Sequence, residues 1–171
     1  MNLNKNYFYY GALLSKLINS GFAPAIMEKE MEDARLYLIT NDHGDYSIYT
    51  KYISTTDANR KKEKRWVFLF SANEITYLKE RINEQPIIAL ICGENNLRGS
   101  KIAFLSFSQF KECIGREYQT PNRNVSVKHL KGSKYFNIYG TGLDGIEDYI
   151  RIRSNISTRL TELEELAKSR H

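Results

Sequence analysis

The residues of this chain best suited to chemistry lie between Asp45 and Phe70. Two runs rich in Tyr, Ile, Val and Phe, typical of β-strands, flank a strongly basic loop there. A lone lysine, Lys51, stands within the first run. Because Lys and Arg side chains are the usual partners of phosphate oxygens, positive charge gathered beside a strand lysine suits a surface that handles phosphate groups.

Basic residues are concentrated in two segments. Residues 57–65 hold five basic and two acidic residues, a surplus of +3, and residues 116–134 hold five basic and one acidic residue, a surplus of +4, whereas the whole chain carries +5. Such segregated charge is the electrostatic footprint of a protein that binds the phosphate backbone of DNA or RNA. The residues predicted to bind nucleic acid are Arg60, Lys61, Lys62, Lys64, Arg65, Arg123, Lys128, Lys131 and Lys134.

Two other interpretations of the basic segments stay open. They fit an acidic protein partner, as expected of a non-catalytic inhibitor or immunity-type factor. They also fit solvated loops that only keep the protein soluble. Salt distinguishes nucleic-acid binding from a largely apolar protein interface, because phosphate binding weakens steeply as ionic strength rises.

Helical and strand patterns alternate along the chain. Helices are predicted at residues 7–20, after capping patterns at Ser71–Glu74 and Ser106–Gln109, and in a long closing segment from about Ile146. The run RWVFLF is predicted to be buried on both faces in the middle of a sheet, because it is almost unbroken in its apolar character. The strands are predicted at 34–40, 46–53, 65–70, 86–92 and 101–107, with two more inside 116–140.

This order predicts an α+β or mixed α/β fold with a central sheet, flanking helices and a long C-terminal helix. We expect one domain over residues 1–171, with a core at about 7–114 and a basic, β-containing segment plus the closing helix at 115–171. The apolar stripe of the closing helix needs a partner, either this domain or a second subunit of a homodimer. Its members are Ile156, Leu160, Leu163 and Ala167.

The order helix, β-meander, helix, strand over roughly residues 7–92 resembles the core of the PD-(D/E)XK nuclease superfamily. The resemblance implies a metal-dependent phosphodiester hydrolase of DNA or RNA, with Mg²⁺ as cofactor. It implies that Asp45, an acid at a strand start, binds the metal, and that Lys51 orients or activates the attacking water. Tyr49 stands where the family's D/E-x-K motif has its acid.

An acid could instead come from the segment MEKEMED, because carboxylates from different elements can converge on one cation. Within that segment Glu30 and Asp33 are candidate catalytic residues, and Asp33 would join Asp45 as a metal ligand. The alternative is that these acids flank the first strand and pair with nearby Lys and Arg. Lys51 would then be an exposed strand lysine that protects a sheet edge.

Several other classes of protein do not fit the sequence. The longest apolar run, 86–92, is far shorter than the roughly 20 residues that cross a bilayer, and the start MNLNKN lacks a signal-peptide pattern. We therefore expect a cytosolic protein without membrane contact. Cys92 and Cys113 fall on apolar patterns, so no disulfide is expected, and the three His are scattered rather than clustered as in a zinc site.

Overall fold

The structure is a computed structural model that describes residues 2–31, 34–54, 62–95, 97–116 and 121–169, with the backbone alone at residues 24–28 and 30. Its helices are α1 (Lys5–Asn19), α2 (Ala72–Glu80), α3 (Phe107–Ile114) and α4 (Ile156–Lys168), with a 3-10 turn η1 at Ile82–Glu84. Its strands are β1 (Ala23–Glu30), β2 (Ala34–Asn41), β3 (Gly44–Ser54), β4 (Glu63–Phe70), β5 (Ile87–Gly93), β6 (Lys101–Leu105), β7 (Arg123–Leu130), β8 (Tyr135–Gly140) and β9 (Ile150–Arg153).

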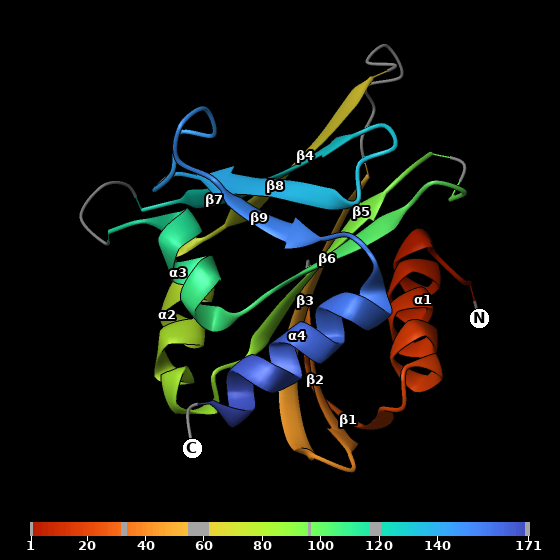
Figure 1. Ribbon diagram of the computed structural model, residues 1–171. Coiled ribbons are helices and arrows are strands. Elements are labelled where there is room, and N and C mark those ends of the chain that lie inside the picture. Colours follow the sequence, from red (N-terminus) through yellow and green to blue (C-terminus); the bar gives the residue numbers. More distant parts are fainter. Residues whose placement is uncertain (1, 32–33, 55–61, 96, 117–120, 170–171) are drawn as a thin grey trace.

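The strands form two sheets, which confirms the predicted mixed α+β class with a C-terminal helix (Figure 1). Sheet A has the order β1-β2-β3-β5-β6, and sheet B has the order β4-β7-β8-β9. All neighbouring strands are antiparallel except β3 and β5, which run parallel. The helices α1 and α4 pack on one face of sheet A, and sheet B packs on the other face together with α2 and α3.

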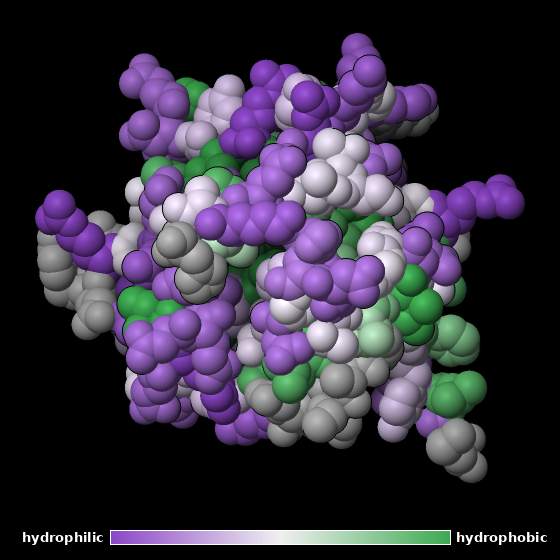
Figure 2. All heavy atoms as spheres, turned by 60° about the horizontal axis from the view of Figure 1, so that its bottom comes forward, coloured by the Kyte–Doolittle hydropathy of each residue, from purple (hydrophilic) through white to green (hydrophobic). Residues whose placement is uncertain are grey.

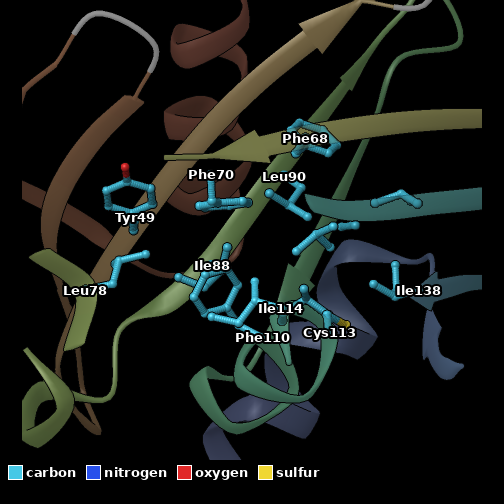
Figure 3. Close-up of a cluster of buried hydrophobic side chains, with 14 of the residues drawn as sticks. Tyr49, Phe68, Phe70, Leu78, Ile88, Leu90, Phe110, Cys113, Ile114 and Ile138 are labelled. Atoms are coloured by element: carbon cyan, nitrogen blue, oxygen red, sulfur yellow. The ribbon is translucent and has the colours of Figure 1, made fainter. Parts of the chain in front are cut away.

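The larger core lies between the two sheets (Figure 3). Strand β4 contributes Trp66, Phe68 and Phe70, each at most 1% exposed, and α3 contributes Phe110. The indole nitrogen of Trp66 donates to the carbonyl oxygen of Gly93 at 3.0 Å, so a hydrogen bond as well as apolar packing joins β4 to sheet A. Large buried aromatic side chains are worth about 3–5 kcal/mol each when truncated, so this layer holds the sheets together.

Strand β4 was predicted in the middle of the central sheet with both faces buried, and this is wrong. It is an edge strand of sheet B, and its Leu69 is 66% exposed. The place beside β3 is taken by β5. The first four residues of the segment MEKEMED lie in β1, which pairs with β2. The antiparallel meander of sheet A is therefore β1-β2-β3. Strand β1 was not predicted, because the charged residues at its end interrupt its apolar pattern.

The closing helix begins at Ile156, not near Ile146, because β9 occupies residues 150–153. Asn155 caps it by accepting a hydrogen bond from the backbone N–H of Thr158 at 3.0 Å. Leu160 and Leu163 of its apolar stripe are buried with side chains of α1 and sheet A, so the stripe finds a partner within this chain. None of the described helices has the length and apolar character of a membrane span.

The surface away from sheet B is mainly hydrophilic (Figure 2). Apolar side chains gather at its right-hand edge, on the side where α1 lies in Figure 1. Phe8 and Ile18 are apolar residues of the first helix, but they are 55% and 53% exposed. The buried stripe consists instead of Tyr9, Tyr10, Leu13 and Leu17.

Candidate nucleic-acid interface

Strand alternation determines which side chains lie on the outer face of sheet B, the face turned away from sheet A. Successive side chains of a strand point to opposite faces, and alternate positions of β4, β7, β8 and β9 turn toward the core between the sheets, most of them apolar and buried. The positions between them face away from the core. Charged and polar side chains and two tyrosines stand there, beside three apolar residues of β4 and β7 (Val67, Leu69 and Leu130). The charged, polar and tyrosine positions include Arg65, Lys128, Tyr135, Asn137, Tyr139, Arg151 and Arg153.

Four of these residues form one line across all four strands. Arg65 of β4 lies opposite Lys128 of β7, Lys128 lies opposite Asn137 of β8, and Asn137 lies opposite Arg151 of β9. With neighbouring strands about 4.8 Å apart, the line is about 14 Å long. We call these four residues the basic row. It runs across the strand direction and carries three cations and one amide.

Two tyrosines of β8 flank the basic row. The guanidinium carbons of Arg151 and Arg153 lie 4.1 Å and 4.8 Å from the ring centre of Tyr135. On the other side, Nζ of Lys128 lies 5.3 Å from the ring centre of Tyr139, whose hydroxyl accepts a hydrogen bond from Nη1 of Arg65 at 3.4 Å. Cations within about 6 Å of a ring centre are attracted to its π face, so the rings hold these long side chains in place.

Three further lysines extend the positive charge at one end of sheet B. Lys62, Lys131 and Lys134 are exposed, and the backbone N–H of Lys131 donates to the carbonyl oxygen of Lys62 at 2.9 Å. This bond holds the β7–β8 turn against the start of β4. We use the term basic face for seven cations: Lys62, Arg65, Lys128, Lys131, Lys134, Arg151 and Arg153.

Most of the basic face lacks an acidic partner among the described residues. Lys128 lies 3.6 Å from Glu63, and Arg153 lies 3.8 Å from Glu162. The other five cations form no ion pair with a described Asp or Glu. Cations held in place without neutralising partners attract an external anion, because their charge is not already compensated by the protein.

An acidic turn bounds the basic face beyond Tyr139. The Oδ1 atom of Asp144 accepts hydrogen bonds from the backbone N–H groups of residues 146, 148 and 147, which lower the pKa of this exposed carboxyl. Gly145 lies against the ring of Tyr139, where a Cβ atom would come within 2.6 Å of Cδ2. The turn therefore covers part of Tyr139, while Tyr135 lies at the positive end of the face.

The structure brings together five of the nine residues predicted to bind nucleic acid: Lys62, Arg65, Lys128, Lys131 and Lys134. Arg60 and Lys61 lie outside the described residues. Lys64 has the same strand parity as the buried Trp66 and pairs with Glu94. Arg123 is only 4% exposed, and its Nη1 donates to the carbonyl oxygen of Gly115 at 3.2 Å.

Sequence reasoning missed Arg151, Arg153 and Tyr135. The two arginines were assigned to the closing helix, although IRIR alternates apolar and basic residues with the period of a strand. The same period in YFNIYG puts Tyr135, Asn137 and Tyr139 on one face. Alternation alone could have placed these residues on one surface.

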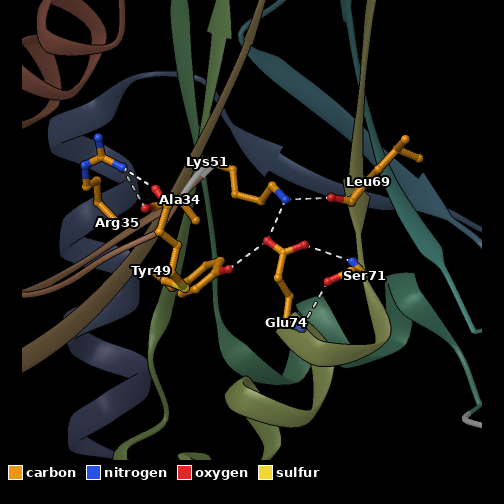
Figure 4. Close-up of polar contacts among 8 residues, drawn as sticks. Ala34, Arg35, Tyr49, Lys51, Leu69, Ser71 and Glu74 are labelled. Carbon is orange, nitrogen blue, oxygen red and sulfur yellow. Dashed lines mark hydrogen bonds and ion pairs between the residues drawn. The ribbon is translucent and has the colours of Figure 1, made fainter.

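Lys51 lies in a buried polar network (Figure 4). It is 6% exposed, and its Nζ lies 2.6 Å from both the carbonyl oxygen of Leu69 and Oε1 of Glu74. The Tyr49 hydroxyl donates to the same Oε1 at 2.8 Å. The ammonium group thus joins β3 of sheet A to β4 and to α2, which is a structural role.

The buried network shifts the pKa of the Glu74 carboxyl and that of the Tyr49 hydroxyl in opposite directions. Burial by itself raises the pKa of Glu74, but the hydrogen bonds from Lys51, from the Ser71 backbone and from Tyr49 outweigh burial, and its pKa is lowered. Burial and the adjacent Glu74 carboxylate raise the pKa of Tyr49 far above its usual range. At neutral pH Glu74 is therefore a carboxylate and Tyr49 a neutral phenol.

The acids expected to accompany Lys51 lie in different places. Asp45 is exposed opposite Thr40, six residues along β3 from Lys51, which is about 20 Å at strand rise. The backbone of Glu30 lies opposite Arg35, at the Lys51 end of sheet A, and Asp33 lies outside the described residues. In the described part of the chain, no three His, Cys, Asp or Glu side chains gather closely enough to hold a metal ion.

Asp45 lines a surface pocket of about 410 Å³ between the β2–β3 turn, η1 and the end of α4. The floor includes Phe107 and Leu163, and the hydroxyl of Ser47 donates to Oε2 of Glu84 at 3.0 Å. This pocket lies at the opposite end of β3 from Lys51, so it does not join Asp45 to the network around Glu74.

Comparison with known proteins gives no match to this chain, whether with protein-family models, with curated proteins or with solved structures. Function is therefore inferred from the side chains themselves. Of the places just described, the basic face gathers the most exposed charge on one surface.

Proposed function

We propose that this protein binds nucleic acid, DNA or RNA, through the basic face. The observation that supports the proposal best is the basic row, in which Arg65, Lys128 and Arg151 cross sheet B from one edge strand to the other. The lysines of the β7–β8 turn and Lys62 extend it at one end. A backbone of phosphates is the common ligand that presents many negative charges in a line.

The energy of such binding comes from charge neutralisation. Each phosphate that meets a Lys or Arg releases condensed counterions, so the logarithm of affinity falls linearly with the logarithm of salt concentration. With seven cations on the face, the slope should be several units when most of them contact phosphates. The two arginines held against the ring of Tyr135 carry N–H groups that can donate to phosphate oxygens.

The proposal is tested by measuring the fluorescence anisotropy of labelled DNA and RNA of about 20 nucleotides as salt rises from about 50 mM to about 300 mM. The variant Arg65→Ala/Lys128→Ala/Arg151→Ala should bind roughly tenfold or more weakly, with a slope smaller by about three units or less. The matched control Lys5→Ala/Lys16→Ala/Lys168→Ala removes the same charge from exposed positions of α1 and α4. It should bind like the parent.

Two results would overturn the proposal. One is the absence of binding by the parent protein at low salt. The other is an equal loss of affinity in the control variant, which would assign binding to net charge rather than to this face. The first result would favour an acidic protein partner, the alternative drawn from the sequence, because the same cations would attract carboxylates.

Phosphodiester hydrolysis stays a prediction based on the order of elements. It is tested in the same samples by adding Mg²⁺ or Mn²⁺ and separating the products on a denaturing gel, with a chelator as control. Cleavage that the chelator abolishes would add catalysis to the proposed binding. Intact oligonucleotides under all these conditions would leave binding as the function.

A further inference from the structure

Tyr135 and its two arginines form a stacking surface at the positive end of the basic face. Tyr135 pairs with Arg153 across β8 and β9, and Arg151 is the next residue of β9 on the same face. Both guanidinium groups lie within 5 Å of the ring centre, and both arginines are exposed. The cluster therefore presents flat π groups and positive charge together.

We propose that this cluster takes an unpaired base, so that the basic face prefers single-stranded to double-stranded nucleic acid; the inference rests on the proposed function. The faces of bases are hidden in a duplex, where each base stacks on its neighbours. In a single strand they are free to stack on aromatic rings and on the planes of Arg guanidinium groups. The basic row beside the cluster supplies the partners for the adjoining phosphates.

The shape of sheet B also favours a single strand. A duplex is read through its grooves, and the major groove admits a protruding helix or two-stranded ribbon. The helices α1 and α4 pack on sheet A, and α2 and α3 pack in the core between the sheets, so none of these four lies on the outer face of sheet B. What the outer face offers is a broad four-stranded surface with side chains standing on it.

Asn137 gives this surface a group that can hydrogen-bond to a base. Its place in the basic row lies between Lys128 and Arg151, and it is two residues from Tyr135 on the same strand face. A side-chain amide offers one acceptor and two donors, which match the polar edge of a base. That Watson–Crick edge is accessible only when the base is unpaired.

The test compares a single strand with a duplex of the same sequence and length at one salt concentration. The probes are fluorescein-labelled oligonucleotides of about 20 nucleotides, as DNA and as RNA. The parent should bind the single strand roughly tenfold or more tightly than the duplex. Tyr135→Leu, which removes the ring, should weaken single-strand binding about tenfold and leave duplex binding nearly unchanged.

Two control variants separate stacking from damage to the fold. Tyr135→Phe keeps the ring and should bind the single strand like the parent. Tyr7→Leu removes a ring that is 55% exposed on α1 and should have no effect. Equal affinity for single strand and duplex, or an equal loss for both in Tyr135→Leu, would overturn stacking while leaving nucleic-acid binding in place. No binding to either probe would overturn the proposed function itself.

Discussion

The guanidinium carbon of Arg151 lies 4.1 Å from the ring centre of Tyr135. The two residues come from different strands, and the pairing of Asn137 with Arg151 and of Tyr135 with Arg153 sets their places. Two arginines two residues apart on one strand face repel each other, and the nearby Tyr135 ring reduces that cost by attracting both cations. The ring thereby lets sheet B concentrate positive charge at its edge strand.

Reversing the charge of Arg151 should strongly weaken nucleic-acid binding. Arg151→Glu places a carboxylate in the basic row, so we expect affinity for a single strand to fall by roughly a hundredfold at about 100 mM salt. Lys5→Glu makes the same change of charge on α1 and is the control. Anisotropy titrations measure both variants, and similar losses in the two would show that the position of the charge is irrelevant.

Lys51 should matter for stability. Removing one member of a buried ion pair leaves the other charge without compensation, so Lys51→Ala should lower the free energy of unfolding by about 3 kcal/mol. The double variant Lys51→Met/Glu74→Gln should be less destabilised than the sum of its single variants, because it removes both charges together. Urea denaturation of the parent, Lys51→Met, Glu74→Gln and the double variant measures the coupling. Additive effects would show that the two groups do not stabilise each other.

The expected loss of stability in Lys51→Ala affects how an assay of catalysis with this variant is interpreted. As a candidate catalytic lysine, Lys51 would be the natural residue to change to Ala in a test of catalysis. The contacts of its Nζ with Leu69 and Glu74 show that the substitution disturbs the junction of the two sheets. Loss of activity in such a variant would therefore need a stability measurement beside it.

Elements defined by local chemistry could be predicted from the sequence. Both capping boxes form as expected: Ser71 accepts from the N–H of Glu74, and Ser106 accepts from the N–H of Gln109. The hairpin of β2 and β3 also follows from a short polar turn between alternating strands. In each case the residues that decide the structure lie within a few positions of one another.

Pairings between distant residues could not be predicted in this way. Nothing near RWVFLF indicates that it pairs with residues 123–130 rather than with β3, because that choice depends on which faces fit in the folded core. The burial of Lys51 has the same origin, since its partner Glu74 lies 23 residues away. The basic face is likewise a product of pairing between β4, β7, β8 and β9.

Acidic pH should destabilise the protein through His129. This ring is 8% exposed, and burial, its largest influence, lowers its pKa, although its Nε2 donates to the carbonyl oxygen of Ser133 at 2.9 Å. The unfolded state therefore binds the proton of His129 more readily than the folded state does. The contribution of neutral His129 to the free energy of unfolding is complete above the unfolded pKa of 6.5, and it is lost as the pH falls toward the folded pKa. Urea midpoints at about pH 7.5 and about pH 5.5 should therefore differ less for His129→Gln than for the parent. An unchanged difference would assign the pH effect to other groups.

Docking of α4 on sheet A should depend on Leu160, which is 3% exposed and lies in the core shared with α1. Leu160→Asp forces a carboxylate into that core, where it must either remain charged without a partner or take up a proton. We therefore expect the free energy of unfolding to fall by several kcal/mol, on the order of half the stability of a typical domain. Thr161→Asp introduces the same side chain one residue later, at an exposed position, and should change stability by no more than about 1 kcal/mol. Thermal melts followed by circular dichroism compare the two variants. Equal melting temperatures would mean that α4 does not pack through Leu160, and that its apolar stripe is available to a second subunit.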